Sequence, residues 1–258
     1  MQNTRVFLMV FFLLFLTQGN GIAQIHVSNE VGVLAGPAGF FTDYGERWNV
    51  RNNLENEGFG VGVVHYLSFA YKARCTCERS ESWFSDHFRI RNEFDYLRSK
   101  LEHFGPVANG KGEGARKLRA MHGFTETYEL GTHLEYHFMR IKDFTNFAVL
   151  FGPYVSLGVH YVYYTPTAYS DLGPVDDPKI LFPSFQGGLD LEPSTTFAIS
   201  GSVGVRYRLG MQHDLLIDAR WNYYNSDFID GLDVQGPQNK YNDWIFWLNV
   251  GYVFYINF

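Results

Sequence analysis

The sequence is poor in several features that mark other classes of protein. Its two cysteines, Cys75 and Cys77, are too few for a disulfide framework or a zinc motif. Lysine and arginine total 21 against 27 aspartates and glutamates, and the basic residues form no cluster, so we expect no nucleic-acid partner. No glycine-rich fingerprint lies in a βαβ pattern, so we expect no nucleotide and assign no cofactor.

Long apolar runs are also scarce. The first, residues 6–16, follows Arg5 and is too short to span a bilayer as a helix, which takes about 20 residues. Small residues at Gly21 and Ala23 complete the pattern of a secretory signal peptide, so we expect residues 1–23 to be removed. A membrane anchor or a buried helix is the alternative. No second long run supports a helical membrane protein, and no repeat or linker divides residues 24–258, which should form one domain.

Aromatic residues, by contrast, are abundant. Phe, Trp and Tyr make up 18% of the chain, although the mean hydropathy is slightly negative at −0.17. In the last segment, residues 244–258, every second residue is large and apolar. Because side chains alternate between the faces of a strand, these residues form one apolar stripe. A soluble sheet would need a partner to cover that stripe, whereas a transmembrane barrel turns it to lipid.

The same two-residue period recurs in eight segments of the chain. They are residues 27–35, 58–69, 86–98, 124–138, 147–163, 197–209, 214–223 and 244–258. With an even number of antiparallel strands, the first strand begins and the last strand ends on the same side of the membrane. We therefore predict an all-β fold, an eight-stranded antiparallel transmembrane β-barrel with up-and-down meander topology and long extracellular loops. A soluble, aromatic-rich β-sandwich is the alternative.

Loop lengths predict how this barrel lies in the bacterial outer membrane. The connections at residues 36–57, 99–122, 164–196 and 225–242 are long, and those at 139–146 and 210–213 are short. Outer-membrane barrels have long extracellular loops and short periplasmic turns, so we expect both termini in the periplasm. The connection at residues 70–85 is longer than this rule expects. An interfacial girdle at the outer rim would contain Tyr161, Tyr163, Tyr164, Tyr223, Tyr224 and Trp244.

The inward faces of the predicted strands carry charges of both signs. An eight-stranded barrel is filled by its own side chains, and buried charges have to be paired. We therefore predict an ion-paired lumen without an open channel, with a small aqueous pathway beside the inward glycines as the alternative. The predicted network consists of Arg89, Arg91, Glu93, Asp95, Glu129, Glu135, Arg206, Arg208, Asp218 and Arg220.

His133, Glu135 and His137 are the candidate metal ligands. They project from one face at about 6.6 Å spacing, and imidazole with carboxylate can hold zinc. Successive residues on one face lie too far apart to chelate without partners from neighbouring strands. We therefore assign no metal site and expect lumen ion pairing for these side chains.

Two other pairs of residues carry reactive side chains. Ser156 and His160 share an inward face without an obvious acid, and a lipid hydrolase would need its nucleophile where acyl chains can reach it. Cys75 and Cys77 could form a strained disulfide with each other, remain free or pair with another protein. We assign no catalytic residue to the chain.

Five stretches of the chain carry a likeness to a known family, and they are residues 41–49, 58–71, 153–158, 214–224 and 242–258. In these stretches the chain resembles a family of outer-membrane barrel proteins from Flavobacteria and related Bacteroidota. More distantly, its size and its glycine-rich first hairpin are similar to those of the PorG-like barrel component of the type IX secretion machinery. The terminal pattern resembles the assembly signal of outer-membrane barrels, with Tyr252, Phe254, Ile256 and Phe258 as its residues.

These observations lead us to expect a non-enzymatic barrel that anchors or scaffolds an envelope assembly, such as one for secretion or surface display. The expected partners are outer-membrane lipid, the barrel-assembly machinery and other envelope proteins. Long, polar loops suit such contacts, and we expect residues 43–47 and 171–192 to provide them. A small-solute or ion pathway is the first alternative, and a lipid-modifying outer-membrane enzyme is the second.

Overall fold

The computed structural model describes residues 28–45, 49–50, 53, 55–56, 58–69, 82–234 and 241–256. Four parts of the prediction fall outside these ranges. They are the signal peptide at residues 1–23, Glu46 and Arg47 of the expected contact loop, the pair Cys75 and Cys77, and Phe258 of the expected assembly signal. None of the helices in the described ranges is long and apolar enough to cross a bilayer.

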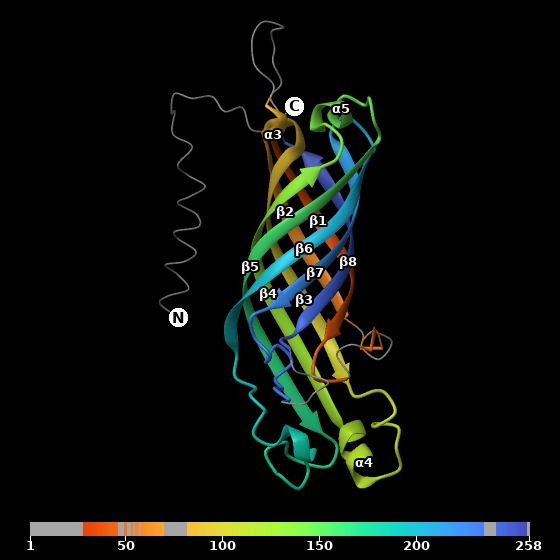
Figure 1. Ribbon diagram of the computed structural model, residues 1–258, viewed down its shortest axis with the longest axis vertical. Coiled ribbons are helices and arrows are strands. Elements are labelled where there is room, and N and C mark those ends of the chain that lie inside the picture. Colours follow the sequence, from red (N-terminus) through yellow and green to blue (C-terminus); the bar gives the residue numbers. More distant parts are fainter. Residues whose placement is uncertain are drawn as a thin grey trace, which may run out of the picture.

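The described strands close into one antiparallel barrel (Figure 1). Each strand pairs with its neighbours in the sequence, and β1 pairs with β8 from Glu30 opposite Tyr255 to Phe41 opposite Trp244. The predicted fold class, an eight-stranded antiparallel barrel, is confirmed. The strands are β1 (Ser28–Phe41), β2 (Gly58–Ser68), β3 (Phe88–Glu102), β4 (Met121–His137), β5 (Phe151–Ser170), β6 (Ser194–Arg208), β7 (His213–Tyr224) and β8 (Trp244–Tyr255).

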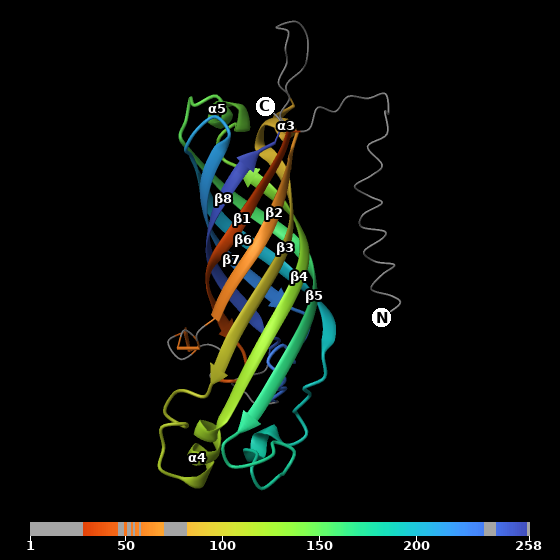
Figure 2. The same cartoon turned by 180° about the vertical axis from the view of Figure 1, so that it is seen from behind.

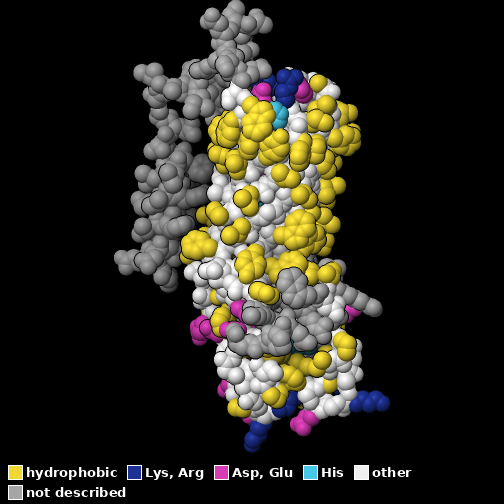
Figure 3. All heavy atoms as spheres, viewed as in Figure 1, with side chains coloured by type: hydrophobic (Ala, Val, Ile, Leu, Met, Phe, Trp, Pro, Cys, Tyr) yellow, Lys and Arg dark blue, Asp and Glu magenta, His cyan; other side chains and the backbone are white. Residues whose placement is uncertain are grey.

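Exposure alternates along the strands because successive side chains point to opposite sides of the wall. On β5, Leu157 is 67% exposed and Val159 is 57% exposed, whereas Ser156 and His160 are buried. Figure 3 shows hydrophobic side chains over much of the visible wall and charged side chains at its two ends. A wall of this kind is stable against hydrocarbon, and its closed strand pairing satisfies the backbone, so the barrel can span a bilayer.

Two rows of aromatic side chains border the apolar wall. In the first, which we call the far tyrosine row, Tyr96, Tyr128 and Tyr163 are paired across β3, β4 and β5, with ring centroids 5.1 and 6.2 Å apart. The second row, at the other end, includes Phe88, Tyr136, Phe138, Phe151 and Tyr207. From Tyr128 to Phe138 the chain covers about 33 Å, or about 25 Å along the barrel axis at a tilt of about 40°. This is the height of an outer-membrane apolar band, and aromatic rows mark its interfaces.

The two ends of the barrel differ in the length of their connections. We call the end where β1 begins and β8 ends the base (Figure 1). Helix α3 (Trp83–His87) precedes β3 at the base, the β4–β5 connection contains α5 (Ile141–Thr145), and β6 joins β7 through residues 209–212. The opposite end carries α4 (Glu113–Ala120) and the 3-10 helix η1 (Pro183–Phe185), and its connections are long. At the base, the connections after β4 and β6 are shorter, whereas residues 69–87 between β2 and β3 are as many as in a connection of the opposite end.

Strands β3, β4 and β5 extend beyond the rest of the barrel at the end away from the base (Figure 2). Together with the segments packed on them they form what we call the platform, residues 40–45, 97–126, 164–193 and 225–234. The expected strand ends are wrong here, because residues 99–102, 121–123 and 164–170 pair as strands and not as loops. Their outward side chains, such as Thr165 and Thr167, are polar. These segments therefore lack the apolar stripe on which the prediction depended.

The polarity of β3 reverses at the far tyrosine row. Between the two aromatic rows, its inward side chains are charged and its outward ones are mostly apolar. Beyond the far row, Leu97 and Leu101 point inward with 0% exposure, and the outward positions are Arg98, Lys100 and Glu102. The reversal follows the medium outside the wall, which is lipid on one side of the row and water on the other.

The platform has an apolar core that closes the end of the barrel. Residues 225–234 turn inward, and Ile229 and Leu232 have no exposed surface. The backbone N–H of Val234 donates to the Asp43 carboxylate at 2.7 Å, and the N–H of Asp43 donates to Asp230 at 2.8 Å. The expected surface position of residues 43–47 is therefore wrong for Asp43, which is 2% exposed; Glu46 and Arg47 lie outside the described residues. The core includes Phe40, Tyr44, Leu97, Leu101, Leu118, Met121, Leu181, Phe185, Ile229 and Leu232.

Candidate functional site

The ten residues of the predicted lumen network all lie inside the barrel, each at most 2% exposed. They come from β3, β4, β6 and β7, whose inward faces converge on the barrel axis. The structure adds two buried carboxylates that the prediction omitted, Glu30 on β1 and Asp214 on β7. Both stand at inward positions of the two-residue pattern, so the signal for them is present in the sequence.

At the base, three arginines share two carboxylates. Nη1 of Arg206 lies 2.6 Å from Oε2 of Glu30, and Nη1 of Arg89 lies 3.1 Å from the same oxygen. Nη1 of Arg208 pairs with Oδ1 of Asp214 at 2.9 Å, while Nη1 of Arg206 is 3.5 Å from Oδ2 of Asp214. This group therefore has one more positive charge than negative charges.

In the middle of the barrel, two arginines are shared among several carboxylates. Arg91 lies 3.1 Å from Glu93 through Nε and 3.1 Å from Glu135 through Nη1. Arg220 donates to Asp95 at 2.8 Å and to Oε2 of Glu93 at 2.9 Å. Both arginines also contact Asp218, which accepts hydrogen bonds from Tyr154 and Ser202.

Glu129 organises the lumen next to the platform. Its Oε2 lies 3.0 Å from Nδ1 of His160 and accepts from Nδ2 of Asn222 at 2.9 Å. Its Oε1 accepts from the hydroxyls of Thr127 and Tyr224. Tyr224 was expected at the outer rim, but it points into the lumen because side chains alternate along β7 and its neighbour Tyr223 faces outward. Tyr164 also points inward, with its hydroxyl 3.2 Å from Ser226.

The buried charges of the described strands do not cancel. The carboxylates number seven and the guanidinium groups five, which leaves a net charge of −2 when the histidines are neutral. The carboxylates are those of Glu30, Glu93, Asp95, Glu129, Glu135, Asp214 and Asp218, and the guanidinium groups those of Arg89, Arg91, Arg206, Arg208 and Arg220. Since buried charge without a counter-charge is costly, this excess has to be relieved, either by protons on carboxylates or histidines or by a bound cation.

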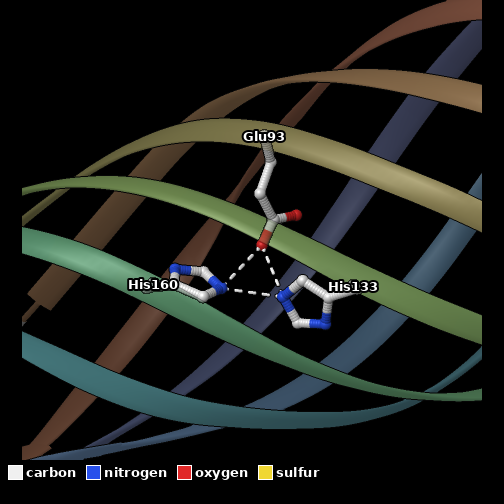
Figure 4. A group of neighbouring side chains, drawn as sticks. All are labelled: Glu93, His133 and His160. Carbon is white, nitrogen blue, oxygen red and sulfur yellow. Dashed lines mark hydrogen bonds and ion pairs between the residues drawn. The ribbon is translucent and has the colours of Figure 1, made fainter.

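Glu93, His133 and His160 converge from β3, β4 and β5 at the centre of this excess (Figure 4). Oε1 of Glu93 lies 2.8 Å from Nε2 of His133 and 3.0 Å from Nε2 of His160. The two Nε2 atoms are 2.7 Å apart. Each of the three residues has a lone pair that can point to one centre.

Two glycines make room for these imidazole rings. Gly131 lies opposite His160 and Gly158 lies opposite His133 in the β4–β5 pairing. A Cβ atom at Gly131 would lie 2.7 Å from the ring of His160, and one at Gly158 would lie 2.5 Å from the ring of His133. No side chain of β4 or β5 therefore occupies the space directly beside these two rings.

The structure brings together a different trio from the predicted metal ligands. Of His133, Glu135 and His137, only His133 belongs to the cluster, while Nε2 of His137 lies 3.2 Å from Oε2 of Glu135. The neighbouring strands supply the partners that the prediction lacked, Glu93 and His160. Sequence reasoning missed this trio because it depends on the register of three strands.

The predicted pair Ser156 and His160 is not a catalytic pair in this arrangement. Oγ of Ser156 lies 3.0 Å from Nδ1 of His133 and 2.8 Å from Oγ of Ser202. His160 instead contacts Glu93 and Glu129. Ser156 lies inside the lumen at 9% exposure, away from the wall that faces acyl chains.

In the platform, burial shifts the pKa values of two side chains outside the membrane-spanning wall. Burial, with a smaller effect of the charge on Asp230, raises the pKa of the Tyr44 hydroxyl well above its usual value. Burial, with a smaller effect of His122, lowers the pKa of His103 to about 3. The ring of His103 is stacked between Tyr44 and Phe185, with centroid distances of 4.7 and 5.2 Å. His103 is therefore neutral in the folded protein at neutral pH.

Closed antiparallel pairing, a charged interior and an apolar wall between aromatic rows define this chain as a transmembrane β-barrel of the outer-membrane type. No protein-family model matches the chain, and no curated protein matches it either. The resemblance to the Bacteroidota family thus stays a prediction.

Solved structures with a similar fold are barrels of bacterial outer membranes. Ail, the attachment invasion locus protein of Yersinia pestis, solved with the heparin analogue sucrose octasulfate, has a TM-score of 0.41 and 13% identity, covering 88% of this chain and 99% of Ail. A major outer membrane protein from Thermus thermophilus has a TM-score of 0.44 and 12% identity, covering 88% and 99%. OprG from Pseudomonas aeruginosa has a TM-score of 0.37 and 14% identity, covering 89% and 97%. Because these values are low, the fold class rests on the strand pairing of the chain itself.

Proposed function

We propose that this protein is a non-enzymatic barrel of the bacterial outer membrane that anchors or scaffolds an envelope assembly through its platform. The observation that carries the proposal is the contrast between a wall whose lumen contains buried ion pairs and a platform whose interior is mainly apolar and continuous with that lumen. A filled barrel fixes the protein in the membrane, and continuous strands β3, β4 and β5 hold the platform at a set position relative to it.

The orientation follows from the same contrast between wall and platform. Outer-membrane barrels carry their long connections outside the cell, so the platform lies at the cell surface and the base, with both termini, in the periplasm. The sequence resemblance to the Bacteroidota barrels and to the type IX secretion component makes a secretion or surface assembly the favoured context. The partners are outer-membrane lipid, the barrel-assembly machinery and a surface protein bound by the platform.

The exposed surface of the platform suits a protein partner. Helix α4 presents Arg116 and Arg119 to solvent, and the segment 171–193 presents Asp176 and Lys179. The platform also exposes an apolar residue, Val107, which is 60% exposed, and charged residues of both signs occur at the rims of protein interfaces. Within residues 171–192, Leu181 and Phe185 are buried, so this expected contact loop is folded onto the platform.

Site-specific photo-cross-linking in cells tests the proposal. A photoreactive residue is placed at Arg116 or Lys179 on the platform, with Val159 on the lipid-facing wall as the matched control. We expect a discrete cross-linked protein from at least one platform position and none from Val159. Absence of any cross-linked protein from both platform positions would count against an anchor or scaffold.

Single-channel recording in planar bilayers tests the first alternative. The ion-paired lumen leads us to expect no unit conductance from the purified barrel. Steady unit currents that depend on the protein would instead favour a small-solute or ion pathway. Unchanged membrane lipid profiles on deletion of the protein would exclude the lipid-modifying alternative.

A further inference from the structure

We propose that Glu93, His133 and His160 bind one divalent transition-metal ion, of which zinc is the best match, inside the barrel. This inference is independent of the proposed function. Two imidazoles and one carboxylate form a donor set that zinc accepts, and three protein ligands leave a fourth position for a small oxygen ligand.

The distances are close to those that a metal requires. The three donor atoms are separated by 2.7, 2.8 and 3.0 Å. A tetrahedral ion with bonds of about 2.0 Å holds its ligand atoms about 3.3 Å apart, so the trio has to open by about 0.5 Å. Figure 4 shows that the three side chains already face a common point.

The surrounding contacts orient one histidine as a ligand. Nδ1 of His160 lies 3.0 Å from Oε2 of Glu129, so its N–H donates to that carboxylate and Nε2 is left with its lone pair facing Glu93. A carboxylate behind a ligating histidine is a regular feature of zinc sites. Nδ1 of His133 lies 3.0 Å from the Ser156 hydroxyl, which can accept its N–H, and 3.2 Å from Nη2 of Arg91, which can only donate. For Nε2 of His133 to bind a metal, this guanidinium group has to turn away from Nδ1.

Arg91 and Arg220 oppose a cation at this position. Nη2 of Arg91 lies 3.2 Å from Nδ1 of His133, and Nη1 of Arg220 lies 2.8 Å from Oε1 of Glu93. Five carboxylates share this part of the lumen with the two arginines, so the local balance is still negative. They are those of Glu93, Asp95, Glu129, Glu135 and Asp218. A divalent ion supplies the two positive charges that the described strands lack.

Two glycines leave room for the imidazole rings of the trio, as Gly60 and Gly204 do for Trp247 and Tyr154 elsewhere in the barrel. Gly131 and Gly158 stand where any larger residue would push the two rings out of position. Protonated His160, donating to Glu93 and Glu129 at once, is the competing arrangement, because it also adds positive charge. Direct measurement of bound metal separates the two arrangements.

The test uses the full chain, extracted from membranes in detergent, unfolded with EDTA and refolded with Zn²⁺ or Co²⁺. Because the trio is buried, the ion has to enter while the barrel folds. After gel filtration, we expect about one ion per chain and, with cobalt, the visible absorption of a tetrahedral site. His160→Gln and Glu93→Gln should each lower the bound metal at least about tenfold.

His137→Gln is the matched control, since His137 is also buried in the lumen but contacts Glu135 and not the trio. It should retain the metal. Circular dichroism and resistance to SDS verify that each variant is a folded barrel. Gly158→Ala is a further variant, which keeps all three ligands but displaces the ring of His133. Wild-type protein without bound metal, equal loss in His137→Gln, or full binding by folded His160→Gln would each overturn the proposal.

Discussion

The wall of the barrel and the platform bury opposite kinds of side chain. Inside the wall the buried groups include many ion pairs, such as Arg220 with Asp95, beside apolar residues such as Trp247, whereas inside the platform most are apolar, such as Ile229 and Leu232. Outside, the order is reversed, with apolar residues on the wall and Arg98, Lys100 and Glu102 on the platform. One strand, β3, runs through both regions and changes over at Tyr96.

The difference shows that the surrounding medium determines what the interior contains. Against lipid, the strand turns its apolar face outward, and the opposite face has to be satisfied by pairing charges within the lumen. Where water surrounds the strand, burying its apolar face inside the platform stabilises the fold through the hydrophobic effect. The two interiors therefore depend on different forces, and substitutions should affect them differently.

The largest effect is expected for Arg220→Met. The substitution leaves Glu93, Asp95 and Asp218 in the lumen without their shared cation, and we expect a loss of about 3–5 kcal/mol in the free energy of unfolding. Denaturant unfolding in micelles, followed by tryptophan fluorescence, measures it. Arg98→Met is the control, because its exposed pair with Glu126 spans 3.9 Å and should contribute under about 1 kcal/mol. Equal losses for the two substitutions would show that buried lumen ion pairs are no more important for stability than exposed platform ion pairs.

A charge on the outside of the wall should come next. Leu157→Arg places a guanidinium group on the lipid-facing side of β5 and should cost about 2–4 kcal/mol. Thr167→Arg on the same strand lies beyond the far tyrosine row and should change stability by under about 1 kcal/mol. Unfolding from lipid vesicles compares them. Similar costs at both positions would show that the membrane boundary is not at Tyr163.

Leu232→Ala tests whether the platform core is separate from the wall. Removing this fully buried side chain should destabilise the platform by about 2–3 kcal/mol. We expect faster hydrogen exchange in residues 225–234 and an unchanged unfolding midpoint for the wall. Val107→Ala, at an exposed platform position, should leave both unchanged. A fall in the wall midpoint equal to the platform effect would mean that the two regions unfold as one.

The smallest effect concerns pH and His103. Burial lowers the pKa of His103 to about 3, below the ordinary value of 6.5, so the unfolded chain binds a proton that the folded platform does not. Between pH 7 and pH 6 platform stability should therefore fall by under about 1 kcal/mol, and it should fall further as the pH approaches 3. His103→Phe, stacked between the same rings, should flatten this dependence of hydrogen exchange. An unchanged slope in that variant would assign the effect to other groups.

The wall was predictable from the sequence because lipid on one side and charge on the other produce an unbroken two-residue period. The pattern on β3 and β7 identified the residues that the lumen buries. It failed at the strand ends, because Thr165 and Thr167 continue the period with polar outward residues. The reversal at Tyr96 looks like the end of a strand when the medium outside is unknown.

The trio proposed to bind metal could not be predicted from the two-residue period of single strands. Glu93, His133 and His160 lie on three strands, and only the register that sets Gly131 opposite both Glu93 and His160 brings them together. Register depends on the whole closed sheet, not on any one segment. The pairing of Asp43 with Asp230 and Val234 likewise joins segments at opposite ends of the sequence.

The charged lumen also limits how the protein can enter a membrane. A single hairpin of β3 and β4 placed in lipid would leave Glu93 and Asp95 facing hydrocarbon without the counter-charge of Arg220 on β7. Insertion of hairpins one after another is therefore disfavoured. The strands have to cross the bilayer as a nearly complete curled sheet, so a slow concerted step should govern how fast newly made chains mature.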